Sequence, residues 1–144
     1  MKDRTATPAE IGLRYLSLGY RLRRVVDDGM TSAGLSLART KVLQVLDRHG
    51  AMRQSSLARE LGHAPRSVTQ SVEALEREGL VERAADPTDG RSRLVGLTPE
   101  GARALAAGTA AGERVLHEIF GTLERERLAD LGELLDAIDA GLGG

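Results

Sequence analysis

A change of hydrophobic period, from helical to strand-like, organises residues 54–98. A short helical run (54–62) is followed by a turn and a longer amphipathic run (65–77). Two strand-like runs then flank a Pro/Asp/Gly turn (81–97). Apolar residues recur with helical spacing in the longer run and mark one buried face: Val68, Val72 and Leu75. This order of elements predicts a helix-turn-helix followed by a β-hairpin, which is the plan of a winged helix.

The face opposite these apolar residues is polar. It presents four long polar side chains with two short hydroxyls beside them: Arg66, Gln70, Glu73, Arg77, Ser67 and Thr69. Such side chains near a helix N-terminus can reach base edges or phosphates in a DNA major groove. We predict that Arg66, Thr69 and Gln70 contact bases, with Ser67 on a base or a phosphate. The alternative is an ordinary surface helix, in which the acidic and basic residues spaced i, i+4 only pair with each other.

The predicted hairpin has a turn rich in turn-forming residues (86–90), and two arginines follow it at once. Arg91 and Arg93 are two residues apart and therefore share one face of the returning strand. A rigid tip bearing arginines can enter a narrow minor groove or straddle phosphates. A simpler interpretation is that Asp89 and Arg91 pair to close the turn. Both interpretations can hold together.

At this point the sequence resembles the MarR family of transcriptional regulators. The resemblance lies in three stretches: QSSLARELG (54–62), SVTQSVEALEREGLVER (67–83) and DPTDGRSRLVGLTPEG (86–101). The last is the most specific, because Asp89 and Arg91 match the family's Asp-x-Arg wing turn and Arg93 falls where a second basic residue is common. Two positions depart from the pattern. Arg53 stands where the family usually has a Thr or Ser helix cap, and Gly90 replaces a residue that is frequently basic.

The resemblance implies a DNA-binding repressor that small phenolic or lipophilic anions release from a pseudo-palindromic operator. Such ligands bind between the dimerisation helices and the winged helix. Here the cleft would draw on the helix after the wing and on part of the first helix: Arg14, Tyr15 and Arg21. The same three positions are also compatible with ordinary packing in the hydrophobic core, without any ligand. Three residues at the start of the first motif helix are expected to donate to phosphates: Gln54, Ser55 and Ser56.

Each end of the chain carries an apolar seam with spacings of three and four. The first lies in a helix predicted over 9–30 and the second in a helix over 124–141, and their residues are Ile11, Tyr15, Leu18, Leu22, Val25, Leu128, Leu131, Leu135, Ile138 and Leu142. Two such seams exceed what a lone winged helix needs, so we predict that terminal helices of two chains interleave into a homodimer. An intramolecular core role for the first helix remains the alternative.

The expected fold class is thus mostly α with a small β-hairpin wing (α+β). The chain divides into an N-terminal dimerisation helix (1–35), the winged helix-turn-helix region (36–98) and C-terminal dimerisation helices (99–144), all within one intertwined domain. A scaffold helix is expected over 36–48 with Gly50 as its stop, and another over 99–120 with Thr98 as its N-cap.

The composition and length of the chain limit the classes of protein to which it can belong. The 144 residues suffice for one domain with a real core, and the scarcity of aromatics favours helices packed through aliphatic side chains. The absence of cysteine excludes disulfides, thiolate metal sites and cysteine redox switches. No run of 18 apolar residues and no signal-peptide pattern occurs, so we expect a soluble, cytoplasmic protein without a membrane partner.

Net charge is −1, but its distribution is uneven. Residues 1–50 hold nine basic and five acidic side chains, and residues 51–103 hold eight of each. Residues 104–144 hold three basic and eight acidic side chains, so the acidic excess lies away from the predicted DNA face. A local positive surface remains compatible with this balance, which predicts only modest non-specific affinity for DNA.

Enzyme chemistry finds no support in the motifs. The three histidines have no metal-ligand spacing, and neither a nucleophile elbow nor a phosphate loop occurs, so we expect no catalytic residue, cofactor or metal. Two other classes stay open. One is a metal-responsive regulator that uses His117 with Glu113 or Glu118. The other is a winged helix that binds a partner protein, as the neutral balance of residues 51–103 would allow.

Overall fold

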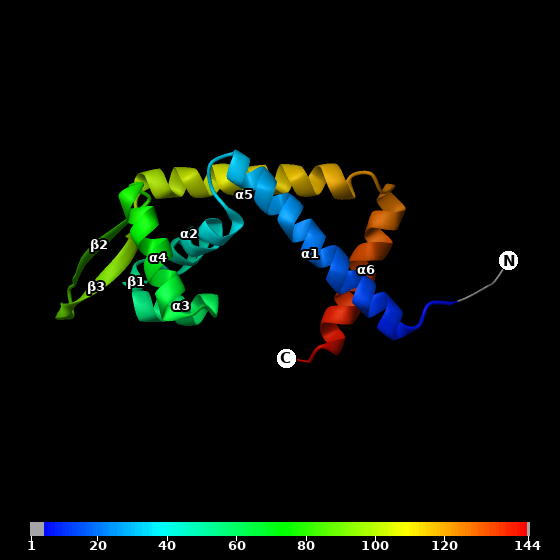
Figure 1. The fold of residues 1–144 in the computed structure, drawn as a ribbon, viewed down its shortest axis with the longest axis horizontal. Helices are drawn as coiled ribbons and strands as arrows, with labels where there is room; N and C mark the ends of the chain where they lie inside the picture. The colour runs from blue at the N-terminus through cyan, green and yellow to red at the C-terminus, as the bar shows by residue number, and fades with distance from the viewer. Residues whose placement is uncertain (1–4, 144) are drawn as a thin grey trace.

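The computed structural model describes residues 5–143, which form six helices and a three-stranded antiparallel sheet. The elements are α1 (Pro8–Ser32), α2 (Leu37–His49), β1 (Met52–Arg53), α3 (Gln54–Leu61), α4 (Pro65–Arg77), β2 (Val81–Asp86), β3 (Asp89–Leu97), α5 (Pro99–Phe120) and α6 (Arg125–Gly141). Helices α2 to α4 and the sheet form a head at one end, and α5 leads away from it (Figure 1). The mostly helical winged-helix class is confirmed.

Side-chain caps define several helix ends; the sequence predicted the Thr98 cap of α5 and the Gly50 stop of α2, but it placed Ser36 inside α2 rather than at its cap. Ser36 caps α2, and Gly50 ends it with a positive φ of 80°. Thr98 caps α5 by accepting a hydrogen bond from the Gly101 amide at 3.0 Å. The same hydroxyl donates to the carbonyl of Gly79 at 2.6 Å, so this cap also anchors the start of α5 to the loop before β2.

The head has a continuous aliphatic core. Its most deeply buried side chains come from α2, α3, α4 and β3: Leu43, Leu46, Leu57, Leu75, Val68, Val72 and Val95. The three residues predicted to form the buried face of α4 are all among them. Because aliphatic side chains from both motif helices and the sheet interlock here, the polar face of α4 is held outward.

The sheet contains one strand more than the predicted hairpin. Strands β2 and β3 pair antiparallel from Val81↔Leu97 to the turn, and β1 adds to the other edge of β3 through two residue pairs. A two-residue strand is too short to show any period, so the sequence pattern could not reveal it. Its effect is to place the start of α3 directly beside the wing.

Helix α5 is continuous, as predicted, and its glycines allow close contacts within the chain. A Cβ at Gly101 would lie 2.0 Å from the Leu80 carbonyl oxygen, and one at Gly112 would lie 3.1 Å from the Met30 sulfur. A Cβ at Gly29 of α1 would lie 2.6 Å from the Cγ2 methyl carbon of Val115 on α5. The absence of side chains therefore lets α5 lie against α1 and the head at short range.

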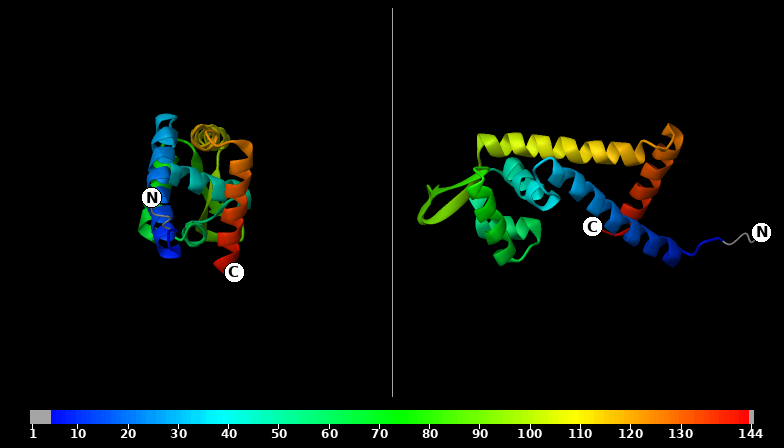
Figure 2. Two further views of the ribbon diagram at one scale, coloured as in Figure 1. Left: turned by 90° about the vertical axis from the view of Figure 1, so that its right-hand side faces the viewer. Right: turned by 45° about the horizontal axis from the view of Figure 1, so that its top comes forward.

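The far ends of α1 and α6 project away from the head. Helix α1 is buried only at Val26 and Met30, near its contact with α5, and α6 buries none of its described side chains. The two helices overlap in Figure 1 but lie apart in the left view of Figure 2. The chain alone therefore leaves long stretches of these helices without a packing partner.

Candidate nucleic-acid interface

The outward face of α4 carries the side chains predicted to reach DNA. Five of the six are exposed: Arg66, Ser67, Gln70, Glu73 and Arg77. Their spacing places Arg66, Gln70, Glu73 and Arg77 on one side of the helix, opposite its buried face. No ion pair joins Glu73 and Arg77 among the described residues, so the surface pairing considered as an alternative does not form.

A hydrogen bond between the two motif helices engages the sixth residue. Thr69 is half-buried; its hydroxyl donates to the Pro65 carbonyl at 2.9 Å and accepts from the Gln54 side-chain amide at 2.5 Å. Gln54 was predicted to contact phosphate, and Thr69 a base. Both are here joined to each other, which ties the first turn of α3 to the first turn of α4.

The turn between these helices depends on Gly62. It is the C-cap of α3 with φ 67° and ψ 29°, a left-handed conformation that glycine adopts without steric cost. Helix α4 begins three residues later at Pro65, where the missing N–H is no loss. The angle between the two helices is thus defined by a short loop.

The wing turn is built around Asp86. The strands pair up to Asp86↔Asp89, so that Pro87 and Thr88 form the tip. Asp86 Oδ1 accepts from the Thr88 amide at 2.9 Å and from its hydroxyl at 2.8 Å. These bonds, with the Arg53 guanidinium beside the carboxylate, hold the pKa of Asp86 below its ordinary value against the opposing effect of burial.

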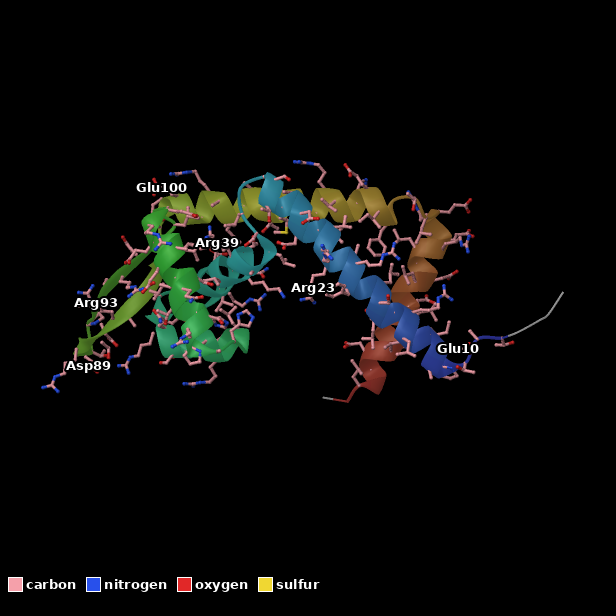
Figure 3. All side chains as sticks on the ribbon, in the orientation of Figure 1. Glu10, Arg23, Arg39, Asp89, Arg93 and Glu100 are labelled. Atoms are coloured by element: carbon pink, nitrogen blue, oxygen red, sulfur yellow. The ribbon has the colours of Figure 1, made fainter. Side chains whose placement is uncertain are left out.

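Asp89 on the other side of the tip does not pair with the Arg91 guanidinium in the structure. Its carboxylate accepts from the backbone amide of Arg91 at 3.1 Å and from the Ser92 hydroxyl at 3.0 Å. The cation that approaches it is Arg53, whose Nη2 lies 3.6 Å from Asp89 Oδ2 and 3.1 Å from Asp86 Oδ2. The side chains of Arg91 and Arg93 are exposed. Figure 3 shows Asp89 at the end of the hairpin and Arg93 along it.

The first turn of α3 has no side-chain cap, because its N-cap residue is Arg53. Ser55 is exposed and Ser56 half-buried in this turn. Arg53, which the sequence marked as a departure, does occupy the N-cap position before α3. Its side chain makes no cap hydrogen bond and is directed to the wing instead.

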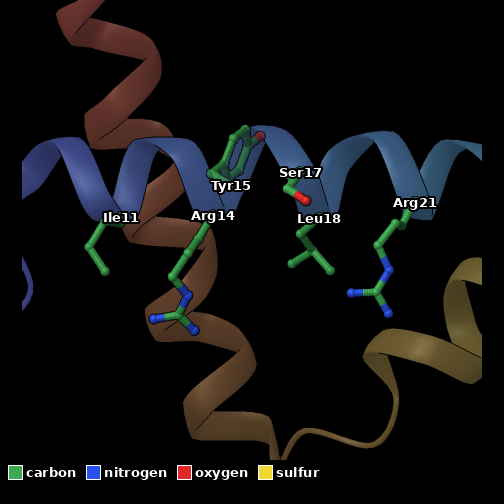
Figure 4. Close-up of a pocket in the computed structure, with 6 residues that line it drawn as sticks. All are labelled: Ile11, Arg14, Tyr15, Ser17, Leu18 and Arg21. Atoms are coloured by element: carbon green, nitrogen blue, oxygen red, sulfur yellow. The ribbon is translucent and has the colours of Figure 1, made fainter.

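The residues predicted to line an effector cleft border a hollow on α1. Its volume is about 440 Å³, and its lining residues, all from α1, are Ile11, Arg14, Tyr15, Ser17, Leu18 and Arg21. In Figure 4 the side chains of Arg14, Leu18 and Arg21 extend from the same side of the helix. No residue of α5 lines this hollow in the described part of the chain, whereas the sequence had suggested that the helix after the wing would contribute.

Two further predictions concern absences within residues 5–143. The histidines and carboxylates there, His117, Glu113 and Glu118 included, form no group of three or more that could hold a metal ion. None of the helices in this range combines the length and apolar character needed to cross a membrane.

A profile of the MarR family matches residues 35–92. The chain is 31% identical over 138 residues to the uncharacterized HTH-type transcriptional regulator Mb0904 of Mycobacterium bovis, with 94% of this chain and 92% of the relative covered. It is 30% identical over 125 residues to the HTH-type transcriptional repressor Mb2911 of the same organism, covering 84% and 90%. The chain belongs to the MarR family. As a MarR-family protein it is a DNA-binding transcriptional regulator rather than an enzyme.

The fold is also that of a solved MarR protein. A MarR mutant from E. coli complexed with operator DNA superposes with a TM-score of 0.70 at 23% identity, covering 89% of this chain and 92% of that one. At this identity the likeness concerns the fold. This MarR-family chain therefore shares the winged-helix fold of that protein.

Sequence reasoning missed the link between α3 and the wing. Asp86 was counted only as a turn former, and Arg53 only as a departure from the usual cap. The two are 33 positions apart, and no local period connects them. The Asp-x-Thr pattern at 86–88 is a signal for a side-chain-bonded turn and could have indicated that the Asp86 carboxylate is engaged.

Proposed function

We propose that this chain acts as a homodimeric repressor that binds a pseudo-palindromic operator and is released from it by a small anionic ligand. The observation that supports this most directly is the exposed row on α4, together with two exposed wing arginines on the same head. Arg66 and Gln70 have the geometry to meet base edges, and Ser67 a base or phosphate. Glu73 and Arg77 lie further along the same row, where the helix leaves the groove.

The other contacts in this proposal involve the minor groove and the phosphate backbone. Arg91 and Arg93 lie in or beside the minor groove, and Asp89 shapes the turn that presents them. Ser55 and Ser56 offer hydroxyls at the uncapped start of α3, where backbone N–H groups also attract phosphate. Gln54 contributes by holding Thr69 and orienting α4, in addition to any phosphate it meets.

The exposed apolar surface supports a homodimer. Every large apolar side chain that is exposed in the described chain lies on α1, in the second half of α5, or at α6 and its C-cap. Helices α1 and α6 also flank an apolar groove of about 930 Å³. Patches of this extent mark interfaces. A second copy would cover the predicted seam residues Ile11, Leu18, Leu22, Leu128, Leu131, Leu135 and Ile138.

A twofold dimer would present two α4 helices roughly 34 Å apart, one turn of DNA, which accounts for the pseudo-palindromic operator. The effector would occupy the hollow on α1, where Arg14 and Arg21 provide cations and Tyr15 an aromatic ring. Because this hollow lies on the dimerisation helix, an occupant can favour a spacing of the two heads that mismatches DNA.

The decisive experiment is a gel-shift titration of the purified protein against DNA from its own upstream region at two salt concentrations. Because Arg and Lys contacts release counterions, affinity for DNA is expected to fall linearly on a log–log plot against salt. Arg66→Ala is expected to weaken operator binding by about 1–3 kcal/mol and to relax sequence preference, if Arg66 reads a guanine.

The matched control is Arg103→Ala, which removes the same charge from an exposed ion pair with Glu100 on α5. It should leave operator affinity within about twofold, since surface pairs of this kind contribute little. An Arg66→Ala protein that binds operator and scrambled DNA as wild type does would refute the base contact. Failure of the wild-type protein to bind any genomic fragment would favour a partner protein as the ligand of the winged helix.

A further inference from the structure

Two adjacent residues at the start of α3 contact the two elements that face DNA. Arg53 pairs with Asp86 and Asp89 at the wing tip, with distances of 3.1 and 3.6 Å from Nη2. Gln54 donates to Thr69 on α4. We propose that Arg53 is a positioning residue, which fixes the wing relative to the recognition helix so that both engage one DNA site together. This inference rests on the proposed function of the head in DNA binding.

The geometry of the contact suits a fixed link. Asp86 is only 8% exposed, and its other oxygen already accepts two hydrogen bonds from Thr88, so the carboxylate that receives Arg53 is immobilised. A guanidinium is a planar fork that can serve two acceptors at once. Both carboxylates flank the same two-residue turn, so a single side chain reaches both sides of the tip.

Among the described residues, no other side-chain ion pair joins the two-residue tip to the head. Strand β1 pairs with β3 at Met52↔Val95 and Arg53↔Leu94, midway along the hairpin and short of its tip. The ion pair from β2 to α4, Arg83 with Glu76 at 3.8 Å, also lies on the base side of the tip. A two-stranded ribbon without further support twists and bends readily. Arg53 is therefore the contact that transmits the position of α3 to the end of the hairpin.

The same contact makes the formal charge of the wing tip more positive. Residues 86–93 carry two carboxylates and two guanidinium groups, so their formal charge is zero. Arg53 adds one positive charge, which brings the formal total to +1, and it lies beside the two carboxylates of Asp86 and Asp89. Without Arg53, the tip would have no net positive charge, and its two carboxylates would face the phosphate backbone without a nearby cation. Their repulsion of the phosphates would weaken the contacts of Arg91 and Arg93.

The contact with the wing also explains why an arginine, rather than a capping residue, stands at the N-cap of α3. A Thr or Ser at position 53 would bond the first amides of α3, but its side chain is too short to reach the wing. Arg53 forms no cap bond and reaches both wing carboxylates instead.

The test compares Arg53→Gln with wild type on operator DNA selected from genomic fragments. Hydroxyl-radical footprinting reports the minor groove under the wing, and dimethyl sulfate protection of guanine reports the major groove under α4. Arg53→Gln is expected to lose hydroxyl-radical protection at the outer flanks, to keep guanine protection, and to raise Kd about tenfold. Arg59→Gln removes an exposed cation from the same helix and should keep both footprints.

Two further variants separate positioning from a direct phosphate contact by Arg53. Asp86→Asn keeps the acceptor for Thr88 but loses the nearer of the two charges that hold Arg53, so it should reproduce most of the loss of flank protection. A direct phosphate contact would survive in Asp86→Asn. Arg53→Lys, a point charge without the fork, should restore the flanks in part.

Three outcomes would overturn the inference. The first is flank protection that persists in Arg53→Gln, and the second is full flank protection in Asp86→Asn. The third is uniform loss of both footprints with a lowered Tm, which would mean a merely structural role. A wild-type protein without any footprint would instead overturn the proposed function on which the inference depends.

Discussion

At the scale of single residues, Thr69 shows how a side chain of the correct type can be engaged inside the fold. The Thr69 hydroxyl donates its one hydrogen to the Pro65 carbonyl, and it accepts a hydrogen bond from the Gln54 side-chain amide. A hydroxyl has one donor and two lone pairs, so Thr69 retains at most one acceptor site for a base. Among the predicted base contacts, Arg66 and Gln70 therefore have the greater freedom to reach DNA.

Asp86 shows the opposite case: the sequence assigned it only to the wing turn, but in the fold it also pairs with Arg53, 33 positions away. It is buried, accepts from Thr88 and meets Arg53. Because the folded chain holds its pKa below the ordinary value, the unfolded chain binds more protons near that value. The stabilisation is therefore complete above the unfolded pKa of about 3.9 and is lost as pH falls through the lower folded pKa.

We predict that Asp86→Asn lowers the free energy of unfolding at pH 7, because the negative charge that pairs with Arg53 is lost and Thr88 then donates to a neutral oxygen. The difference from wild type should shrink as pH falls below about 4, because the carboxylate of the unfolded wild-type chain is protonated there before that of the folded chain. Urea denaturation of both proteins at pH 7, 5, 4 and 3 measures this. A difference that stays constant over this range would contradict the role assigned to the carboxylate charge.

At the scale of elements, α4 and α6 are both amphipathic but differ in what covers their apolar faces. Helix α4 buries Val68, Val72 and Leu75 in the core of its own head. Helix α6 buries nothing, and Ile138 is 55% exposed although it lies in a regular apolar seam. Periodicity predicts that a face will be buried, but it does not say whether the same chain or a second copy buries it.

We predict that Ile138→Asp converts the dimer into monomer, because it places a charge in the apolar interface. Its dissociation constant should rise about thirtyfold or more, as for a central interface residue. Analytical ultracentrifugation over a concentration series measures this, with circular dichroism to check that the helices persist.

Ala129→Asp is the matched control, since nine residues at 100° each place Ala129 on the opposite side of α6. It should leave the dimer intact. A wild-type protein that sediments as a monomer at micromolar concentration would refute the dimer. Equal dissociation of both variants would instead place the interface on another face of α6.

At the scale of the whole molecule, charge is divided between the two ends of the chain. The first 50 residues carry a formal excess of positive charge, and residues 104–144 carry an excess of negative charge. All eight acidic residues of this segment lie at position 113 or beyond, in the second half of α5 and around α6, which Figure 1 shows at a distance from the wing. The net charge of −1 therefore does not oppose DNA binding by the head.

The effector proposal belongs to this scale, because a ligand on α1 has to act on the relative position of two heads. We predict that aromatic carboxylates raise the Tm of the protein and weaken its operator binding about 5- to 150-fold, the usual range of coupling between sites. The corresponding neutral amides should do neither. Arg14→Gln combined with Arg21→Gln should abolish both effects, since the two cations border the hollow.

Thermal shift and gel-shift titration with the same panel check this prediction. Arg103→Ala serves as the control variant and should respond as wild type does. If no carboxylate changes either Tm or operator affinity, the hollow on α1 is not an effector site.

Much of the fold could be predicted from the sequence, because it depends on local patterns. The period of Val68, Val72 and Leu75 predicted the buried face of α4, Thr98 predicted the start of α5, and the residues around Pro87 predicted the wing turn. Each of these signals lies within a few residues, where backbone sterics and hydrogen bonding determine the conformation. The predicted DNA-facing side chains of α4 follow from the same helical period.

Only the tertiary structure decided how distant residues combine. The strand β1, the bond between Gln54 and Thr69, and the pairing of Arg53 with Asp86 and Asp89 all depend on how α3 packs beside α4 and β3. These contacts join residues that are 15 or more positions apart and show no common period. Local chemistry therefore determined the elements of this regulator, and packing determined which of its polar side chains face outward and which hold the elements together.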